Sequence, residues 1–277
     1  MSDPTRPAST EDAGSVRREM VRVRGEVAEA RADEIAEEVP VAFVYNDAPF
    51  AVMMATPCDL VDFAQGFALS EGIVEAIEDA HVESIEHLLE GVEVRMRIPP
   101  QREQALQRRR RSMSGRSGCG VCGSELLEAA LRDPAPVGPG IVVTPAALQR
   151  ALLALRAAQP LGARTGATHA AGWALADGEI ALVREDVGRH NALDKLIGAM
   201  HRAGLDPQAG FLVVTSRASY EMAMKAASAG IAFLAAISAP TALALALAQR
   251  TGLTLLGFAR EDGYALYTHP QRLDAAR

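Results

Sequence analysis

The stretch "FLVVTSRASYEMAMKAASAGIAFLAAIS", residues 211–238, places two short apolar runs on either side of a longer mixed segment. The runs "FLVV" and "FLAAI" are typical of buried strands, and the segment between them is long enough for a helix. A strand, a helix and a second strand in this order form a crossover that pairs the two strands in parallel. The stretch therefore predicts an α/β fold in which helices cover the faces of a sheet with parallel pairs.

The same alternation continues on both sides of this stretch. Upstream, "GWALADGEIALVRED" (172–186) predicts two strands joined at Ala176-Asp177-Gly178, followed by a helix from about 189 to 203. Downstream, we expect a helix after Pro240 and then the strands "LTLLGFA" and "YALYTH". Ligands of such sheets usually bind at the carboxyl ends of the strands. Those ends are "TSRAS" (215–219), "SAPT" (238–241) and "FARED" (258–262).

The N-terminal part predicts a small α+β domain over residues 19–98, after a disordered tail at 1–18. It contains short strands, a hairpin turn at "YNDA" (45–48) and an alternating strand at "VEVRMRI" (92–98). Thr56-Pro57-Cys58-Asp59 has the pattern of a helix start, with Thr56 as N-cap and Asp59 completing a capping box. This helix is expected to end near Gly72, with Cys58 packed in its first turn.

The composition excludes several classes of protein. The chain has 277 residues, 49% of them hydrophobic, and its longest apolar run (232–248) is interrupted by Ser238 and Pro240, so no membrane span is expected. A net charge of −7 argues against nucleic acid as the main partner. Three cysteines and no apolar leader suit the cytoplasm. Arginine provides almost all of the positive charge, and the two lysines are Lys195 and Lys225.

The stretch "SGCGVCGS", residues 117–124, holds Cys119 and Cys122 between glycines and follows an arginine-rich run. We expect residues 99–124 to form a mobile, basic loop. Two thiols at this spacing could bind zinc with a second pair from a dimer or with His169 and His190, or form a thioredoxin-type redox couple. They could also carry sulfur, because nearby positive charge favours the thiolate that attacks another sulfur atom.

Several longer motifs resemble one known family, the formate dehydrogenase accessory sulfurtransferases, often called FdhD. These motifs are "GFALSEGIV" (66–74), "SGCGVCGS" (117–124), "TGATHAAG" (165–172), "REDVGRHNALDKLIG" (184–198), "SRASYEMAMKAASAGI" (216–231) and "APTALALALAQRTGLTLLGFARED" (239–262). They occur in the family's order over about residues 40–270, and "EDVGRHNALDK" is the most specific of them.

The resemblance implies a sulfurtransferase that accepts sulfur as a persulfide from a cysteine desulfurase and passes it to Mo-bis(molybdopterin guanine dinucleotide), which formate dehydrogenase requires. The persulfide would form on Cys119, assisted by Cys122, and the cofactor is a bound substrate, with no metal of the chain's own. The resemblance further implies a homodimer and a cytidine deaminase-like main domain over residues 125–277. The residues implied to bind the cofactor are Phe258, Ala259, Arg260, Glu261, Asp262 and Gly263.

Three alternatives are weighed against this reading. Deamination is disfavoured, because His169 is followed by Ala170-Ala171 and the cysteine pair precedes the histidines, unlike in zinc deaminases. A non-catalytic chaperone for the cofactor and a zinc-binding module through the cysteine pair remain open. His169, His190 and Arg217 lie near predicted strand or helix ends and are candidates for lining the pocket, and whether Lys195 and Lys225 line it as well is left open.

Overall fold

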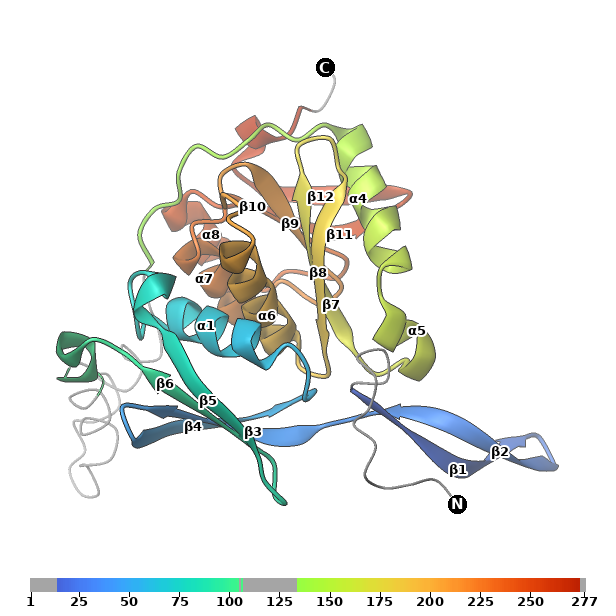
Figure 1. Ribbon diagram of the computed structural model, residues 1–277. Helices are drawn as coiled ribbons and strands as arrows, with labels where there is room; N and C mark the ends of the chain where they lie inside the picture. The colour runs from blue at the N-terminus through green and yellow to red at the C-terminus, as the bar shows by residue number, and fades with distance from the viewer. Residues whose placement is uncertain (1–13, 105, 107–133, 275–277) are drawn as a thin grey trace, which may run out of the picture.

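A computed structural model describes residues 14–104, 106 and 134–274. In this part of the chain, Figure 1 shows a protruding two-stranded ribbon, a small domain built on a four-stranded sheet, and a larger domain built on a six-stranded sheet. The smaller sheet packs against helix α1 (Leu60–Ser70), which in turn packs against helix α6 (Arg189–Arg202) of the larger domain. The expected α/β class is therefore confirmed.

The larger sheet has the strand order β12-β11-β10-β9-β7-β8. Its strands are β7 (His169–Leu175), β8 (Ile180–Asp186), β9 (Gly210–Val214), β10 (Phe233–Ala236), β11 (Thr254–Arg260) and β12 (Gly263–Thr268). The central strands β9, β10 and β11 pair in parallel, as expected from the crossovers, whereas β7, β8 and β12 pair antiparallel. The mixed sheet fits the α/β class, and the likeness to the cytidine deaminase fold stays a prediction.

Helices cover both faces of this sheet (Figure 1). On one face, α6, α7 (Tyr220–Ser228) and α8 (Ala242–Thr251) bury a core around the fully buried Trp173. On the other face, α4 (Pro145–Ala157) packs its leucines against the strands, and the short α5 (Pro160–Thr165) follows it. The sequence analysis did not identify α4 or α5. A signal for α4 was present, because the Thr144 hydroxyl accepts a hydrogen bond from the Ala147 N–H and Pro145 begins the helix.

The small sheet has the strand order β4-β3-β6-β5. Its strands are β3 (Val39–Tyr45), β4 (Ala48–Ala55), β5 (His81–His87) and β6 (Val92–Arg97), and a 3₁₀ turn (Ile77–Asp79) precedes β5. The predicted hairpin is confirmed, because Asn46 and Asp47 take the positive φ angles of a tight turn. Phe43 stacks on Phe67 with ring centroids 4.7 Å apart, which fixes α1 on the sheet.

Two glycines allow α1 and α6 to approach closely. A Cβ atom on Gly66 would lie 1.8 Å from the Asp194 carbonyl oxygen, and one on Gly198 would lie 2.0 Å from the Asp62 carbonyl oxygen. An alanine at either position would force the helices apart. The Asp62 side chain, which is 2% exposed, adds an ion pair of 2.7 Å to Arg202 across the same contact. The two domains therefore share one tightly packed helix pair.

The start of α1 differs from the prediction. Asp59 stands at the N-cap with a φ of 54° and makes no side-chain capping bond, so the predicted Thr56 cap and capping box are wrong. Thr56 instead forms hydrogen bonds with the larger domain. Its hydroxyl accepts from the Val187 N–H, and its own N–H donates to the Asp186 carboxylate. Tertiary hydrogen bonds have replaced the local cap, while the predicted end of the helix near Gly72 is confirmed.

Two predicted boundaries also need correction. The ribbon strands β1 (Ser15–Arg24) and β2 (Val27–Ala36) pair over their full length, so residues 15–18 belong to a strand and not to the tail. Residues 100–104 and 106 are helical, and the buried Leu106 packs in the small-domain core, so the basic loop does not begin at residue 99. The remainder of the expected loop, with both paired cysteines, lies outside the described residues.

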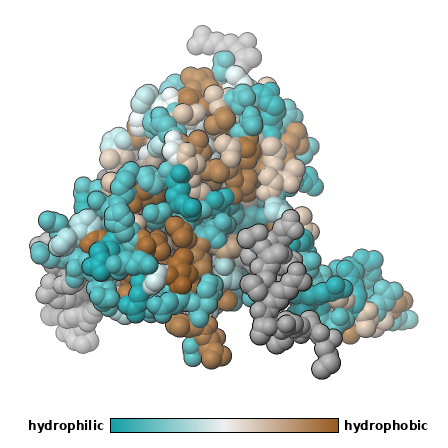
Figure 2. Space-filling view, viewed as in Figure 1, coloured by the Kyte–Doolittle hydropathy of each residue, from teal (hydrophilic) through white to brown (hydrophobic). Residues whose placement is uncertain are grey.

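The face shown in Figure 2 is a mixture of polar and apolar areas. The hairpin between β5 and β6 has an apolar tip, where Leu88 and Leu89 are exposed. Within residues 14–104, 106 and 134–274, no helix has the length and hydropathy needed to cross a bilayer.

Near the end of the described residues lies a 3₁₀ turn (Pro270–Arg272). Its Arg272 guanidinium donates to the carbonyl oxygens of Gly138 and Gly252.

Candidate functional site

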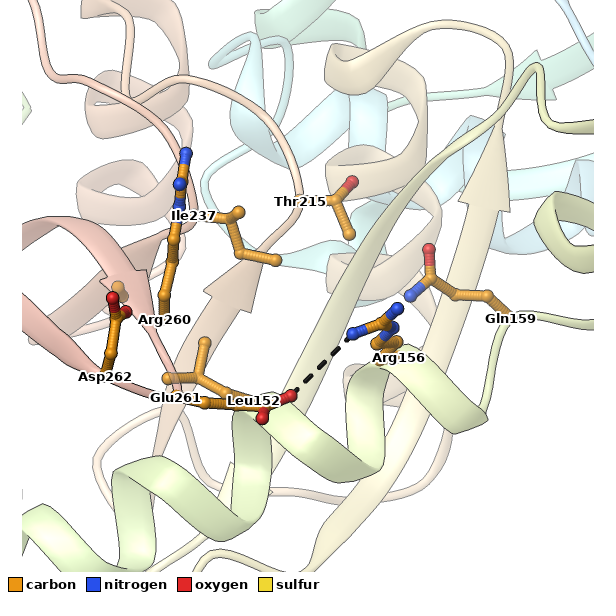
Figure 3. A pocket seen from close by; sticks show the side chains of 9 residues that line it. Leu152, Arg156, Gln159, Thr215, Ile237, Arg260, Glu261 and Asp262 are labelled. Atoms are coloured by element: carbon orange, nitrogen blue, oxygen red, sulfur yellow. Dashed lines mark ion pairs between the residues drawn. The ribbon is translucent and has the colours of Figure 1, made fainter.

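A pocket of about 620 Å³ lies where β9, β10 and β11 end (Figure 3). Thr215 follows β9, Ile237 follows β10, and the last residues of β11 complete this wall, while α4 supplies the opposite wall. Its lining residues are Leu152, Arg156, Gln159, Thr215, Ile237, Ala259, Arg260, Glu261 and Asp262. The pocket therefore lies at the sheet edge that the parallel strands predict, and its volume suits a ligand of nucleotide size.

Charged side chains of both signs surround this pocket. In Figure 3, Arg260 and Asp262 extend from the β11 side, whereas Arg156 and Gln159 lie on the side of α4. Glu261 points toward Arg156 and forms an ion pair with it at 3.7 Å. Guanidinium groups bind phosphates and carboxylates accept N–H groups of a base, so the pocket holds groups suited to both parts of a nucleotide.

Phe258 is held in an unusual backbone conformation beside the pocket. Its φ angle is 51°, which is costly for an aromatic residue, and the pairing of β11 with β12 is irregular between Gly257 and Arg260. The Phe258 N–H donates to the Ser238 carbonyl oxygen at 3.1 Å, which ties this bulge to the loop after β10. Phe258 is 47% exposed, so this strained residue lies at the surface. Strain of this kind is more frequent at functional sites than elsewhere.

The structure brings together part of the residue set that the sequence analysis named. Ala259, Arg260, Glu261 and Asp262 line the pocket, while Phe258 and Gly263 flank these residues without being among the lining residues. Cys119 and Cys122 lie outside the described residues. The sequence analysis missed the opposite wall, because it recognised neither α4 nor α5; Leu152 and Arg156 of α4 and Gln159, which precedes α5, line this wall.

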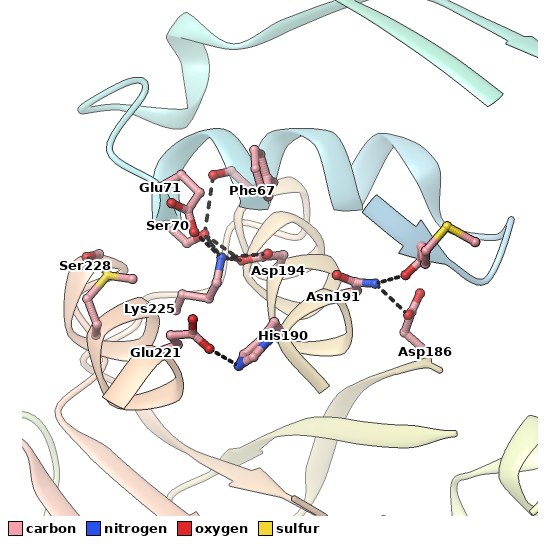
Figure 4. A network of polar contacts seen from close by, with 12 residues as sticks. Phe67, Ser70, Glu71, Asp186, His190, Asn191, Asp194, Glu221, Lys225 and Ser228 are labelled. Atoms are coloured by element: carbon pink, nitrogen blue, oxygen red, sulfur yellow. Dashed lines mark hydrogen bonds and ion pairs between the residues drawn. The ribbon is translucent and has the colours of Figure 1, made fainter. Parts of the chain in front are cut away.

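Lys225 does not line this pocket but lies in a buried polar network between domains (Figure 4). Its ammonium is 2.8 Å from a carboxylate oxygen of Asp194, 2.8 Å from Glu71 and 3.0 Å from the Ser70 hydroxyl. Burial raises the pKa of Asp194, although Lys225 opposes this shift. Burial lowers the pKa of Lys225, but the carboxylates of Asp194 and Glu71 outweigh it, and the net shift is upward. The network therefore stabilises the junction of α1, α6 and α7.

Lys195 has an equivalent role at the other end of α1. It is fully buried, pairs with Asp186 at 2.7 Å and donates to the Thr56 carbonyl oxygen at 2.9 Å. Its ammonium also lies 3.8 Å from the Cys58 sulfur. Burial raises the pKa of the Cys58 thiol, with Lys195 opposing the shift, so this cysteine has the environment of a packed thiol. Both lysines thus join domains and do not line the pocket.

The histidine and arginine candidates also lie away from the pocket lining. The His190 imidazole lies 2.7 Å from the Glu221 carboxylate (Figure 4), and burial is the main reason that the pKa of His190 is lowered. His169 begins β7, and burial and the nearby Arg189 lower its pKa. Arg217 lies in the loop after β9 and is not among the lining residues. None of these three side chains is therefore assigned to ligand binding by the pocket.

Comparisons with known proteins agree with this arrangement. The sequence model of the FdhD/NarQ family matches residues 36–274. The chain is 60% identical over 261 residues to the Sulfur carrier protein FdhD of Xanthomonas euvesicatoria pv. vesicatoria, covering 94% of this chain and 93% of the relative. It is 52% identical over 259 residues to the Sulfur carrier protein FdhD of Bordetella bronchiseptica, covering 93% of this chain and 94% of the relative.

A solved structure shares the same fold. It is the crystal structure of a protein from Desulfotalea psychrophila described as a formate dehydrogenase accessory protein, with a TM-score of 0.73 and 25% identity. The alignment covers 94% of this chain and 99% of that chain. The family match spans the small domain, the larger domain and the pocket described above. The chain belongs to the FdhD/NarQ family.

Proposed function

We propose that this protein is a sulfur carrier that takes sulfur from a cysteine desulfurase as a persulfide and delivers it to Mo-bis(molybdopterin guanine dinucleotide), the cofactor that formate dehydrogenase then receives. The observation that carries the proposal is the pocket at the ends of β9, β10 and β11, in a chain of this family that also has the Cys119/Cys122 pair. The name of the relatives, Sulfur carrier protein FdhD, supports the sulfur-carrying part.

The proposed chemistry begins with the Cys119 thiolate. It attacks the outer sulfur of the donor's persulfide, so that a new S–S bond forms on Cys119 as the donor's S–S bond breaks and the donor leaves as a thiolate. The terminal sulfur is then transferred to the bound cofactor. Attack by the Cys122 thiolate on the inner sulfur releases the outer one as hydrosulfide and leaves a Cys119–Cys122 disulfide, which a cellular dithiol then reduces.

The pocket would hold one guanosine diphosphate portion of the cofactor. Its volume of about 620 Å³ is in the range of single-nucleotide sites, so the second nucleotide portion must lie elsewhere. A second copy of the chain could hold it, which is the reason to expect a homodimer. Arg260 would contact phosphate, Asp262 the N–H edge of guanine, and Phe258 the face of the base.

Mass spectrometry tests the carrier step. The intact protein is incubated with a cysteine desulfurase and cysteine, and we expect a mass gain of one sulfur atom that maps to Cys119. Cys119→Ala should abolish the gain, whereas Cys58→Ala is the matched control, since Cys58 is packed beside Lys195 and should leave the gain unchanged. A gain that survives in Cys119→Ala would contradict the proposal.

A second candidate, which the sequence leaves open, is a chaperone that holds the cofactor without transferring sulfur; the described lining residues, with charged side chains of both signs, are suited to holding a nucleotide. The two functions differ in maturation of formate dehydrogenase. Cys119→Ala should abolish maturation if the chain carries sulfur and leave it near normal if the chain only holds the cofactor. Zinc analysis of the purified protein addresses the remaining alternative, with about one zinc per dimer expected for a site that two cysteine pairs share.

A further inference from the structure

We propose that Arg156 is a phosphate-binding residue of this pocket and that the phosphates of a bound nucleoside diphosphate displace Glu261, the ion-pair partner of Arg156. The inference rests on the proposed function, because it adds a second wall to the site of the guanine dinucleotide. It assigns a role to α4, which lies outside the segment 258–263 that the family resemblance identified.

The geometry of the Arg156–Glu261 ion pair indicates that a phosphate can take the place of the Glu261 carboxylate. The pair joins the α4 wall to the β11 wall at 3.7 Å, which is longer than the contact of a well-formed bidentate pair. The side chains of Arg156 and Glu261 are 82% and 58% exposed, respectively. Exposed pairs of this kind contribute little to stability, because water screens them. A phosphate with two negative charges can therefore replace Glu261 at small cost.

Neighbouring contacts hold α4 and the turn after β11 in place when a phosphate displaces Glu261 from Arg156. The side-chain amide of Gln149 donates to the Glu261 carbonyl oxygen at 3.2 Å, so the turn after β11 is tied to α4 through the main chain. The Arg150 guanidinium donates to the Asp177 carbonyl oxygen at 2.8 Å, which ties α4 to the turn between β7 and β8. The Glu261 side chain can therefore move away without releasing either wall.

The charge pattern fits a diphosphate. Arg156 and Arg260 approach the pocket from opposite walls, so two guanidinium groups can contact successive phosphates (Figure 3). Asp262 extends from the same side as Arg260, away from the Arg156–Glu261 pair, and can accept N–H groups of the base. Arg156 would add nothing to the binding affinity of a nucleoside without phosphates. The contribution of Arg156 should therefore appear only with phosphorylated ligands.

Isothermal titration calorimetry with GDP and with guanosine tests this role. For Arg156→Gln, we expect the Kd for GDP to rise by about tenfold, the size of one charge-assisted contact, and the Kd for guanosine to stay unchanged. Arg156→Lys should give an intermediate loss, because the charge remains and the planar fork does not. Arg97→Gln, at an exposed site of the small sheet where Arg97 pairs with Glu83, is the control and should leave both Kd values unchanged.

The Glu261→Gln variant tests whether Glu261 competes with phosphate for Arg156, which the Arg156 variants alone do not test. Removing the competing carboxylate should lower the Kd for GDP by about two- to fivefold, since an exposed ion pair no longer has to be broken. In the Arg156→Gln/Glu261→Gln double variant, this gain should shrink, because Glu261 acts through Arg156. Thermal unfolding of each variant confirms that the proteins are folded.

The outcomes separate this inference from the proposed function. If the unmodified protein binds GDP and Arg156→Gln binds it equally well, or loses guanosine affinity to the same extent as GDP affinity, the inference is wrong and the pocket assignment stands. An undiminished effect of Glu261→Gln in the double variant would also overturn it. If the unmodified protein does not bind GDP at all, the cofactor pocket fails and the inference fails with it.

Discussion

Replacing Lys225 with Met should destabilise the protein strongly, because it leaves a buried charge without its partner. Asp194 has no solvent exposure, and in the described structure its carboxylate faces the Lys225 ammonium and the Ser70 hydroxyl. Breaking a buried pair by removing one member costs about 3–5 kcal/mol. This is a large part of the roughly 5–15 kcal/mol that stabilises an ordinary protein. We expect Lys225→Met to lose about this amount.

Urea unfolding can follow this loss directly. The chain has a single tryptophan, Trp173, which is fully buried in the larger domain, so its fluorescence reports unfolding. Lys225→Met/Asp194→Leu, which removes both charges, should recover most of the lost stability. Arg97→Met is the matched control, since Arg97 pairs with Glu83 at 2.6 Å at an exposed site, and it should cost less than about 1 kcal/mol.

The loss of folding stability in Lys225→Met should also depend on pH. Burial already raises the pKa of Asp194, and losing Lys225 removes the charge that opposes the shift. A carboxyl that is protonated in the folded protein and ionised in the unfolded chain makes stability fall as pH rises. The stability deficit against the unmodified protein should therefore grow from pH 5 to pH 7, by up to about 1.4 kcal/mol per pH unit. A deficit below about 1 kcal/mol, or one that pH does not change, would refute the reasoning.

Three further predictions test other parts of the structure. Gly66→Ala should lower the free energy of unfolding by about 1–3 kcal/mol or more in urea titrations, because its Cβ would lie 1.8 Å from the Asp194 carbonyl oxygen; an unchanged value would contradict the close helix contact. Burial and Arg189 lower the pKa of His169, so thermal stability should fall as pH drops below about 6.5, and His169→Gln should flatten this slope in melting experiments. Phe258→Gly should raise the melting temperature slightly by relieving the positive φ, and should weaken GDP binding by about tenfold in calorimetry if the ring stacks on the base.

Local patterns predicted the larger sheet well. Short apolar runs such as "FLVV" alternate with helix-length segments, and the three parallel strands follow from that alternation. The position of the pocket was also predictable, because it depends on strand direction, and Thr215, Ile237 and Arg260 lie at the carboxyl ends of the parallel strands. The strand pattern already placed "FARED" (258–262) at that edge, and the resemblance to a known family then singled out the segment 258–263 among the three strand ends.

Tertiary contacts explain what local patterns missed. Thr56 has the sequence signal of an N-cap, yet its hydroxyl and N–H bind partners in the larger domain. Lys195 and Lys225 stand out in an arginine-rich chain, but their role between domains depends on contacts with Thr56 and Glu71, which are far from them in sequence. The approach of Arg156 to Glu261 likewise depends on how α4 packs on the sheet, and no local pattern determines that contact.

The most direct test of sulfur delivery follows one atom through a single turnover. The protein is first loaded with labelled sulfur from a cysteine desulfurase, then mixed with Mo-bis(molybdopterin guanine dinucleotide), and the intact mass is recorded over time. The account predicts that Cys119 gains one labelled sulfur and loses it to the cofactor after mixing. A label that never reaches Cys119, or that stays on the protein while the cofactor remains unlabelled, would contradict it.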